Sequence, residues 1–259
     1  MGKREIRLER FIGILENRKF LSINEMAQAL GVSNMTVRRD FDILNQRDLV
    51  IMKNGILMLN NEHDFQPIRK IYNLDKEMQI KNAVKTSIGR FAASLIRPKD
   101  CVIVDTGSTT ESIIPNLGAD IQISILCYNL NILLPALQNP NIHVSFSSGH
   151  YHPKTQMFES PQGIDFIHSI RANKVFVSAA GVHENLGITC TNSYEVPTKQ
   201  AILQSAAEHI LVADSSKFGK VHAAYFCDLS QIDVVVTDKG ISDEWIAILQ
   251  EKGITLHIV

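Results

Sequence analysis

The chain has 259 residues, of which 45% are hydrophobic, and a net charge of −1, so it can form a sizeable core in one or two domains. Its four cysteines are widely spaced and form no CxxC pair, which argues against a zinc site or a disulfide framework and indicates reduced, mostly buried thiols in a cytosolic protein. No apolar run approaches the roughly 18 residues of a membrane span, and the charged start MGKREIRLERF lacks the apolar segment of a signal peptide.

The charge is unevenly distributed along the chain. Residues 1–60 contain ten Lys or Arg and seven Asp or Glu residues, a net of +3. The remainder contains sixteen and twenty, a net of −4. A small basic module joined to a slightly acidic body is typical of a nucleic-acid reader attached to a second domain.

Three short helices are predicted at the start of the chain. Apolar residues at helical spacing indicate a first helix over about 4–17. The tetrapeptide SINE, from Ser22 to Glu25, is a capping box that begins a second helix, which Gly31 ends. Ser33 then caps a third helix within three residues. A helix, a tight turn containing glycine and another helix form the helix-turn-helix motif.

The third helix has one apolar stripe, formed by Val37, Phe41 and Leu44, which we expect to pack on the first two helices. The opposite face begins with Met35 and continues with Arg39. Because a recognition helix enters the major groove with its N-terminal end first, these outward residues are placed to meet bases and phosphates. Arginine can bind guanine or phosphate through two hydrogen bonds.

Two interpretations of the adjacent arginines remain open at this point. They can be solvated surface residues, with Arg38 paired to Asp42 one turn later. Alternatively they contact a polyanion, because positive charge near a helix N-terminus opposes the macrodipole unless something compensates for it. The complete three-helix pattern favours the second interpretation.

A hairpin is predicted directly after the third helix. Asn54-Gly55 between two apolar runs is a strong signal for a two-residue turn. This hairpin would form a wing beside the recognition helix, with Lys53 near the DNA backbone. Residues 1–60 are therefore predicted to form a winged helix-turn-helix domain, and its candidate DNA contacts are Ser33, Asn34, Met35, Thr36, Arg38, Arg39 and Lys53.

The rest of the chain is predicted to be a linker over 61–75 and an α/β domain over 76–259. The linker lacks periodicity and contains Pro67. In the body, short β-branched apolar runs are separated mostly by helical patterns, which is typical of a parallel sheet covered on both faces. The runs are CVIV, IQISILCY, IHVSF, KVFV, HILV, IDVVV and ITLHIV. Ligands in such sheets bind outside the carboxyl ends of the strands.

The residues that follow these runs are small and polar. The first run is followed by DTGSTT, from Asp105 to Thr110, and then by an apparent helix, which together make a ready anion site suited to phosphate. Any single strand-end residue can instead be a turn or a cap. Together they indicate a pocket for a small, anionic, hydroxyl-rich molecule.

Here the sequence resembles a known family. SINEMAQALGVSNMTVRRDFDIL is similar to the N-terminal signature of the DeoR family of bacterial transcription repressors, and the body, with DTGSTT, SAAGV and VADSSKFGK, is similar to that family's sensor domain. That sensor domain resembles ribose-5-phosphate isomerase and the CoA-transferases. The resemblance covers about residues 5–258. In the family the wing commonly reads basic-x-His-Gly-Gly, whereas this chain has MKNGI, with Lys53 as its one basic residue.

The resemblance implies a cytoplasmic repressor of a carbohydrate or nucleoside catabolic operon, controlled by a phosphorylated sugar effector. Its implied partners are double-stranded operator DNA, the phosphosugar and further copies of the same chain, with no cofactor, no metal and no membrane. Carried onto this sequence, the phosphate loop falls on Asp105, Gly107, Ser108, Thr109 and Thr110. The other pocket positions fall on Asn129, Gly149, Gly181, Glu195, Lys199, Asp214 and Lys217.

Two other classes of protein compete with this interpretation. One is a phosphosugar isomerase or transferase fused to a DNA-binding module, in which Glu195, Lys199 and Asp214 would transfer protons. The other is a structural DNA-binding protein without a ligand, which the polar strand ends argue against. His150 and His152 lack an obvious third metal ligand. We expect a regulator and not an enzyme.

Overall fold

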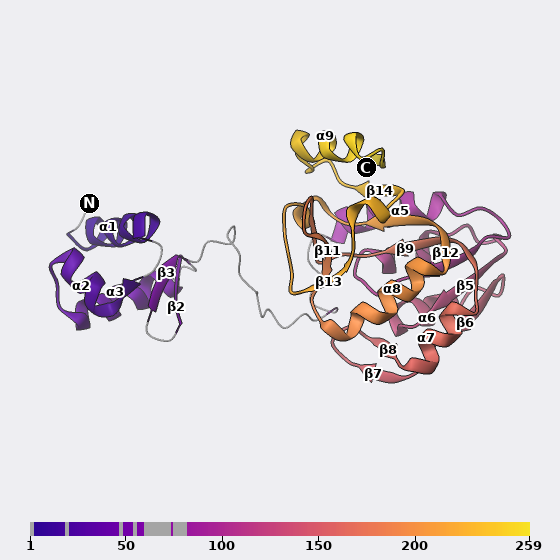
Figure 1. Ribbon diagram of the computed structural model, residues 1–259, viewed down its shortest axis with the longest axis horizontal. Coiled ribbons are helices and arrows are strands. Elements are labelled where there is room, and N and C mark those ends of the chain that lie inside the picture. The colour runs from indigo at the N-terminus through magenta and orange to yellow at the C-terminus, as the bar shows by residue number, and fades with distance from the viewer. Residues whose placement is uncertain (1–2, 19–20, 47–48, 54–55, 60–73, 75–81) are drawn as a thin grey trace. The chain divides into compact units, whose positions relative to one another are not determined.

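The structure is a computed structural model that describes residues 3–18, 21–46, 49–53, 56–59, 74 and 82–259. The chain separates into two compact units, 1–66 and 67–259 (Figure 1). Both predicted domain boundaries, at 60 and 75, lie outside the described residues. Across the described ranges, no helix is long and apolar enough to cross a membrane.

The first unit contains the three predicted helices. They are α1 (Lys3–Arg18), α2 (Ile23–Leu30) and α3 (Asn34–Gln46). The capping box is confirmed, because the Ser22 hydroxyl accepts from the Glu25 amide and the Glu25 carboxylate accepts from the Ser22 amide. Gly31 ends α2 in the left-handed conformation, at φ 67°, which glycine adopts without steric cost.

A small antiparallel sheet completes this unit. Its strands are β1 (Leu21–Ser22), β2 (Val50–Lys53) and β3 (Ile56–Leu59), in the order β1-β3-β2. The register pairs Lys53 with Ile56, as a two-residue hairpin requires. The turn residues Asn54 and Gly55 lie outside the described residues. The strands therefore confirm the wing, and the winged helix-turn-helix fold with it.

Seven strands form one sheet in the second unit, and every pairing between them is parallel. They are β4 (Cys101–Val104), β5 (Ile123–Cys127), β6 (Ile142–Phe146), β9 (Ala172–Val177), β12 (Ala206–Val212), β14 (Val234–Thr237) and β15 (Thr255–Ile258). Their order is β15-β14-β12-β9-β4-β5-β6. Each of the seven predicted apolar runs forms one strand, and the predicted parallel α/β fold is confirmed.

Helices cover both faces of this sheet (Figure 1). Alternate residues of β4 point to opposite sides: Val102 and Val104 pack in one apolar cluster, and Ile103 packs in the other. The helices α5 (Asn82–Ser94) and α6 (Leu130–Ala136) contribute to the first cluster, whereas α7 (Pro161–His168), α8 (Val196–Gln204) and α9 (Asp243–Glu251) contribute to the second. Burial on both faces explains why the strands are almost continuously apolar.

The strands of two smaller antiparallel sheets were not predicted. One sheet contains β10 (Gly181–His183), β11 (Gly187–Cys190) and β13 (Ala224–Cys227), and the other is the hairpin of β7 (His150–His152) and β8 (Met157–Glu159). These strands have three or four residues each, too few for a clear alternation. His150 and His152 therefore lie on a strand, where the His152 ring stacks on Tyr194 with centroids 3.7 Å apart.

The helix predicted after DTGSTT was wrong. The chain forms two short 3₁₀ turns there, η1 (Thr110–Ser112) and η2 (Ile114–Asn116). Pro115 explains the interruption, because proline lacks the N–H that a continuing helix requires. A three-residue turn has almost no macrodipole, so the predicted attraction of an anion to a helix N-terminus has no support at this loop.

Candidate functional site

The recognition helix α3 has one buried face and one exposed face. Val37 and Leu44 are fully buried in the core of the first unit, and Phe41 is half-buried against it. Among the predicted DNA contacts, Thr36 is half-buried and Ser33, Asn34, Met35, Arg38 and Arg39 are exposed. Lys53 ends β2, and its side chain lies outside the described part of the chain.

The polar side chains at the start of α3 bond to their neighbours. The Ser33 and Thr36 hydroxyl oxygens lie 3.0 Å apart, and Ser33 Oγ accepts from the Thr36 amide at 3.3 Å. Asn34 Nδ2 donates to Asn24 Oδ1 at 2.7 Å. Within the described residues, Arg38 forms no ion pair, so its alternative pairing with Asp42 is not observed. The arginines remain exposed on this face.

An ion pair fixes α3 against α1. The Asp40 carboxylate is 1% exposed and accepts from Arg7 Nε at 2.5 Å and from Arg7 Nη2 at 2.9 Å. The hydrogen bond to Asp40 raises the pKa of Arg7. A two-pronged guanidinium–carboxylate contact sets both distance and orientation. It therefore holds the recognition helix in place, and Asp40 is turned away from the exposed face.

The second candidate site lies where the order of the parallel strands reverses. After β4 the chain adds β5 and β6 on one side, and then places β9 on the other side of β4. Open parallel sheets bind ligands at such a switch point, outside the carboxyl ends of the strands. Asp105 directly follows β4 and Ser178 directly follows β9. These two residues therefore mark the expected place.

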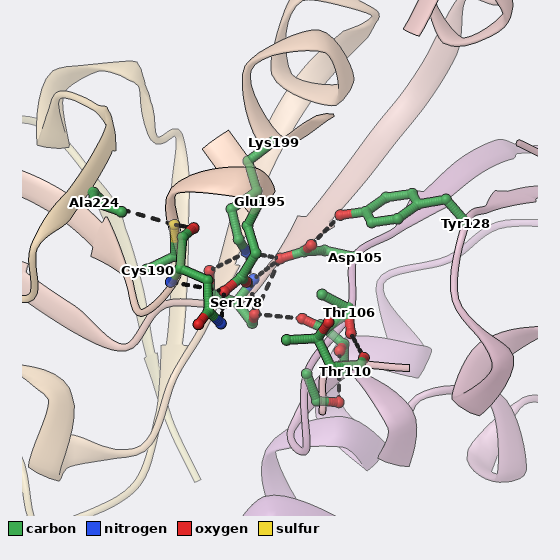
Figure 2. A network of polar contacts seen from close by, with 12 residues as sticks. Asp105, Thr106, Thr110, Tyr128, Ser178, Cys190, Glu195, Lys199 and Ala224 are labelled. Carbon is green, nitrogen blue, oxygen red and sulfur yellow. Dashed lines mark hydrogen bonds and ion pairs between the residues drawn. The ribbon is translucent and has the colours of Figure 1, made fainter. Parts of the chain in front are cut away.

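Asp105 is the centre of a buried polar network, which Figure 2 shows. Its side chain is fully buried. Oδ2 accepts from the Ser178 amide at 2.8 Å, from Ser178 Oγ at 3.0 Å and from Lys199 Nζ at 2.5 Å. Oδ1 accepts from the hydroxyl of Tyr128, which follows β5. Three neighbouring strands and α8 are thereby joined at one carboxylate.

Lys199 is buried with its charge compensated. Nζ also donates to the Ser178 carbonyl at 3.1 Å and lies 5.0 Å from the centroid of the Phe226 ring. Burial alone would lower the pKa of Lys199, but the carboxylates of Asp105 and Glu195 outweigh burial and raise it. The side chain is therefore an ammonium ion in the folded protein. Asp105 and Lys199, which were predicted separately as pocket residues, are brought together, and the two groups bind each other.

Glu195 lies beside this pair. It is 6% exposed, and its Oε1 accepts from the amide of Asn192 at 3.1 Å and from Asn192 Nδ2 at 2.8 Å. Burial raises the pKa of Glu195, and the nearby charge of Lys199 opposes this shift. Two carboxylates and one ammonium ion therefore share a buried region at the switch point.

The loop that follows Asp105 packs closely against β9. Gly107 is required here, because a Cβ atom at this position would lie 2.8 Å from Ser178 Cβ. The Gly107 carbonyl accepts from Thr110 Oγ1 at 3.0 Å and from Asn131 Nδ2 at 3.3 Å. Thr109 and Thr110 are buried, whereas Ser108 is half-buried. The loop is thus a fixed, hydroxyl-rich turn and not a free segment.

Asn129 carries the most informative side chain at this edge. It follows β5, is fully buried, and neither Nδ2 nor Oδ1 has a hydrogen-bond partner in the described structure. An unpaired buried amide costs about 1–3 kcal/mol per group. Such a side chain at the carboxyl edge of a parallel sheet is a candidate ligand contact.

Four predicted pocket residues have local roles in the described structure. Gly149 lies against the Glu159 carbonyl, and Gly181 against the Lys220 carbonyl, where a Cβ atom would clash at 2.2 Å and 2.5 Å. Asp214 caps a short 3₁₀ turn by accepting from the Ser216 amide at 3.1 Å. Lys217 is half-buried, in the loop that pairs with β10 through Val182 and Phe218.

The turn of the β7–β8 hairpin connects this edge to the segment that enters the second unit. The Thr155 carbonyl accepts from Thr106 Oγ1 in the loop at 2.7 Å. One residue earlier, the Lys154 carbonyl accepts from the Leu74 amide at 2.9 Å. The Leu74 side chain is fully buried. Although residue 74 was assigned to the predicted linker, it packs within the second unit.

Tyr128, Ser178 and Thr106 were missed from sequence. Tyr128 ends the apolar run IQISILCY, and Ser178 follows KVFV, so both occupy strand-end positions. Thr106 lies inside DTGSTT. Their positions at the ends of apolar runs are the sequence signal that points to all three.

The cysteines and one surface cavity take no part in this site's chemistry. All four thiols are free, and burial raises the pKa of Cys127, Cys190 and Cys227 to about 12, so these three are unreactive. No cluster of potential metal ligands occurs among the residues that the structure describes. A cavity of about 510 Å³, bordered by Lys99 and His143, lies at the opposite, amino-terminal ends of β5 and β6.

Comparison with known families decides the identity of both units. Residues 7–62 match the DeoR-like helix-turn-helix domain, and residues 80–239 match the DeoR C-terminal sensor domain. The chain belongs to the DeoR family. It is a DNA-binding transcriptional repressor of the DeoR type, as the resemblance of its signature implied.

Curated relatives align along almost the whole chain. The deoxyribose operon repressor of Escherichia coli K12 is 31% identical over 98% of both chains. The transcriptional regulator IolR of Bacillus subtilis 168 is 29% identical over 92% of both chains. A solved ribose 5-phosphate isomerase from Methanocaldococcus jannaschii shares 16% identity over 53% of this chain and 54% of its own, with a TM-score of 0.39. Both curated relatives named above are transcriptional regulators, and the enzyme interpretation is set aside.

Proposed function

We propose that this repressor controls a carbohydrate or nucleoside catabolic operon and is regulated by a phosphorylated sugar bound at the carboxyl edge of its parallel sheet. One observation carries the proposal: the amide of Asn129 is fully buried and unpartnered, and its chain neighbours Tyr128 and Asn131 bond to Asp105 and Gly107 of the hydroxyl-rich loop. An amide that both donates and accepts suits a sugar hydroxyl. The loop hydroxyls and amides suit a phosphate.

The Asp105–Lys199 pair has a supporting role in this proposal. Because each charge already neutralises the other, neither group is free to bind the phosphate. The pair instead fixes the position of Ser178 and of the loop that begins at Asp105. The proposed ligand contacts are therefore Asn129, Ser108, Thr109 and the loop amides, with Glu195 directed toward a sugar hydroxyl.

On the DNA side, the exposed face of α3 reads the operator. Arg38 and Arg39 are exposed and have no described ion-pair partner, so both are available to a base or a phosphate. One small module rarely binds tightly enough alone, which favours a homo-oligomer acting on repeated half-sites. The ligand then weakens operator binding by favouring an arrangement of the copies that does not fit the repeats.

The ligand site is tested by replacing Thr109 with glutamate. A carboxylate in the loop would repel a phosphate, so T109E should bind operator DNA as the wild type does and no longer respond to a phosphosugar. The conservative variant T109S keeps the hydroxyl and should still respond. Titrating each variant against operator DNA, with and without the phosphosugar, measures its operator affinity and its response to the ligand. A normal response in T109E would show that the loop is not the phosphate site.

The DNA site is tested by replacing Arg39 with alanine. Loss of an arginine that reads a base should cost about 1–3 kcal/mol of operator binding. Arg10 is an exposed arginine on α1 in the same unit, and R10A is the matched control. Equal operator affinities for R39A and R10A would remove Arg39 from the interface.

A further inference from the structure

Met35 is unusually exposed for a large apolar side chain. Its exposed fraction is 62%, a value that only Leu137 equals among the described large apolar residues. The other exposed apolar side chains of the first unit range from 36% to 43%. Keeping such a side chain in water is unfavourable by about 25 cal/mol per Å² of apolar surface. A partner that covers it would recover this free energy.

The position of Met35 identifies the partner as DNA. Met35 lies in the first turn of α3, on the same face as Arg39, which follows one turn later. The polar residues beside it are engaged locally, since Ser33 contacts Thr36 and Asn34 donates to Asn24. The first turn of the recognition helix therefore exposes a thioether chain that cannot bond strongly to a phosphate.

The major groove offers one apolar group on its base edges, the C5-methyl of thymine. We propose that Met35 determines operator specificity by packing on a thymine methyl in each half-site. The flexible, polarisable methionine side chain suits such a contact. This inference rests on the proposed operator binding through α3. It goes further by naming the base, thymine, and the group, its C5-methyl, that Met35 recognises.

The experiment begins by selecting the preferred operator from a random DNA pool with the full-length protein at fixed salt. Each thymine of the selected half-site is then replaced, one at a time, by deoxyuridine, which lacks only the C5-methyl. Burying one methyl-sized group is worth about 0.8 kcal/mol, so one substitution should weaken wild-type binding about fourfold per contact. Thymines outside the half-site should show no effect.

Variant proteins connect the missing methyl to Met35. In M35A the fourfold penalty at that thymine should disappear. The side chain that contacts the methyl group is then absent, so the thymine and deoxyuridine DNAs should bind equally well. Met52, 36% exposed on β2, provides a matched methionine. The variant M52Q should keep the penalty. Since the readout is the ratio between two DNAs for the same protein, a variant that merely folds less well does not imitate the result.

Two outcomes would overturn the inference, and they distinguish failure of the methyl contact from failure of operator recognition as a whole. If a sequence is selected but no thymine shows a penalty, or M35A retains it in full, operator binding stands and Met35 reads no methyl. If no sequence is enriched, the proposed operator recognition fails together with this inference. A penalty confined to one position and lost only in M35A supports it.

Discussion

At the scale of single residues, Asp105 and Lys199 form the most completely buried ion pair among the described residues. Taking two charges out of water is costly, and their mutual attraction offsets that cost only when further hydrogen bonds are made. Here the carboxylate accepts from Tyr128 and Ser178, and the ammonium also donates to the Ser178 carbonyl. Removing one charge is therefore much worse than removing both.

Replacing Lys199 with methionine should destabilise the sensor unit by about 3–5 kcal/mol at neutral pH, because it leaves a fully buried carboxylate without its counter-ion. The double variant D105N/K199M should recover a large part of this loss. Urea unfolding followed through Trp245, the one tryptophan of the chain, reports on this unit specifically. A double variant no more stable than K199M would contradict the role of the pair.

Glu195 predicts the direction of a pH effect. Because burial raises its pKa above the ordinary 4.5, the native state binds this proton more tightly than the unfolded chain does. Stability is therefore lost as the pH rises from about 4.5 through the folded pKa. The variant E195Q keeps the acceptor for Asn192 and removes the titration, so its urea midpoint should fall less over this range. If the urea midpoints of the wild type and E195Q fell equally as the pH rises, Glu195 would not contribute to the pH dependence of stability.

Residue-level interpretation of the sequence found the site's components but not their contacts. Asp105 and Lys199 were both predicted to contact the ligand, whereas in the structure they form an ion pair with each other. Their 94-residue separation gave no signal that they bind each other. Gly149 and Gly181 were selected as pocket residues, and their close packing against backbone carbonyls depends on neighbours that no local pattern reveals.

At the scale of elements, strands buried on both faces were predictable and short peripheral strands were not. Each of the seven central strands is a run of buried apolar residues, and this burial produces a strong sequence signal. The hairpin of β7 and β8 has three residues in each strand and mixed burial. Its position depends on contacts with Leu130 and Tyr128, which are distant in sequence.

This hairpin also provides an element-level prediction about regulation. Leu74 and Thr106 bond to adjacent residues of its turn, so we expect a change at the proposed effector loop to reach Leu74. Replacing Leu74 with alanine should preserve operator affinity and reduce the ligand response, which for coupled sites amounts to roughly 5- to 150-fold.

The control for this prediction is Leu137, a 62% exposed leucine at the end of α6. Because L137A removes no buried contact, it should keep the full response to the ligand. The volume-conserving variant L74M should also respond, since methionine can fill the same space. A response in L74A equal to that of the wild type would show that coupling does not pass through this anchor.

At the scale of the whole molecule, two compact units divide the work of a DeoR-type repressor. The first 60 residues carry a net charge of +3 and contain the recognition helix, whereas the remainder carries −4 and contains the buried polar site. The excess positive charge in the DNA-binding part favours association with a polyanion. In the proposed function, this separation allows one sheet to sense a metabolite while another fold reads DNA.

The most direct test is a DNA-binding titration on fragments upstream of the protein's own gene and its neighbours. It uses the full-length protein at fixed salt, with and without a panel of sugar phosphates and the matching unphosphorylated sugars. Tight binding to one fragment, relieved by one phosphosugar and not by its parent sugar, is the predicted result. Specific binding that no sugar phosphate alters would contradict the proposed regulation.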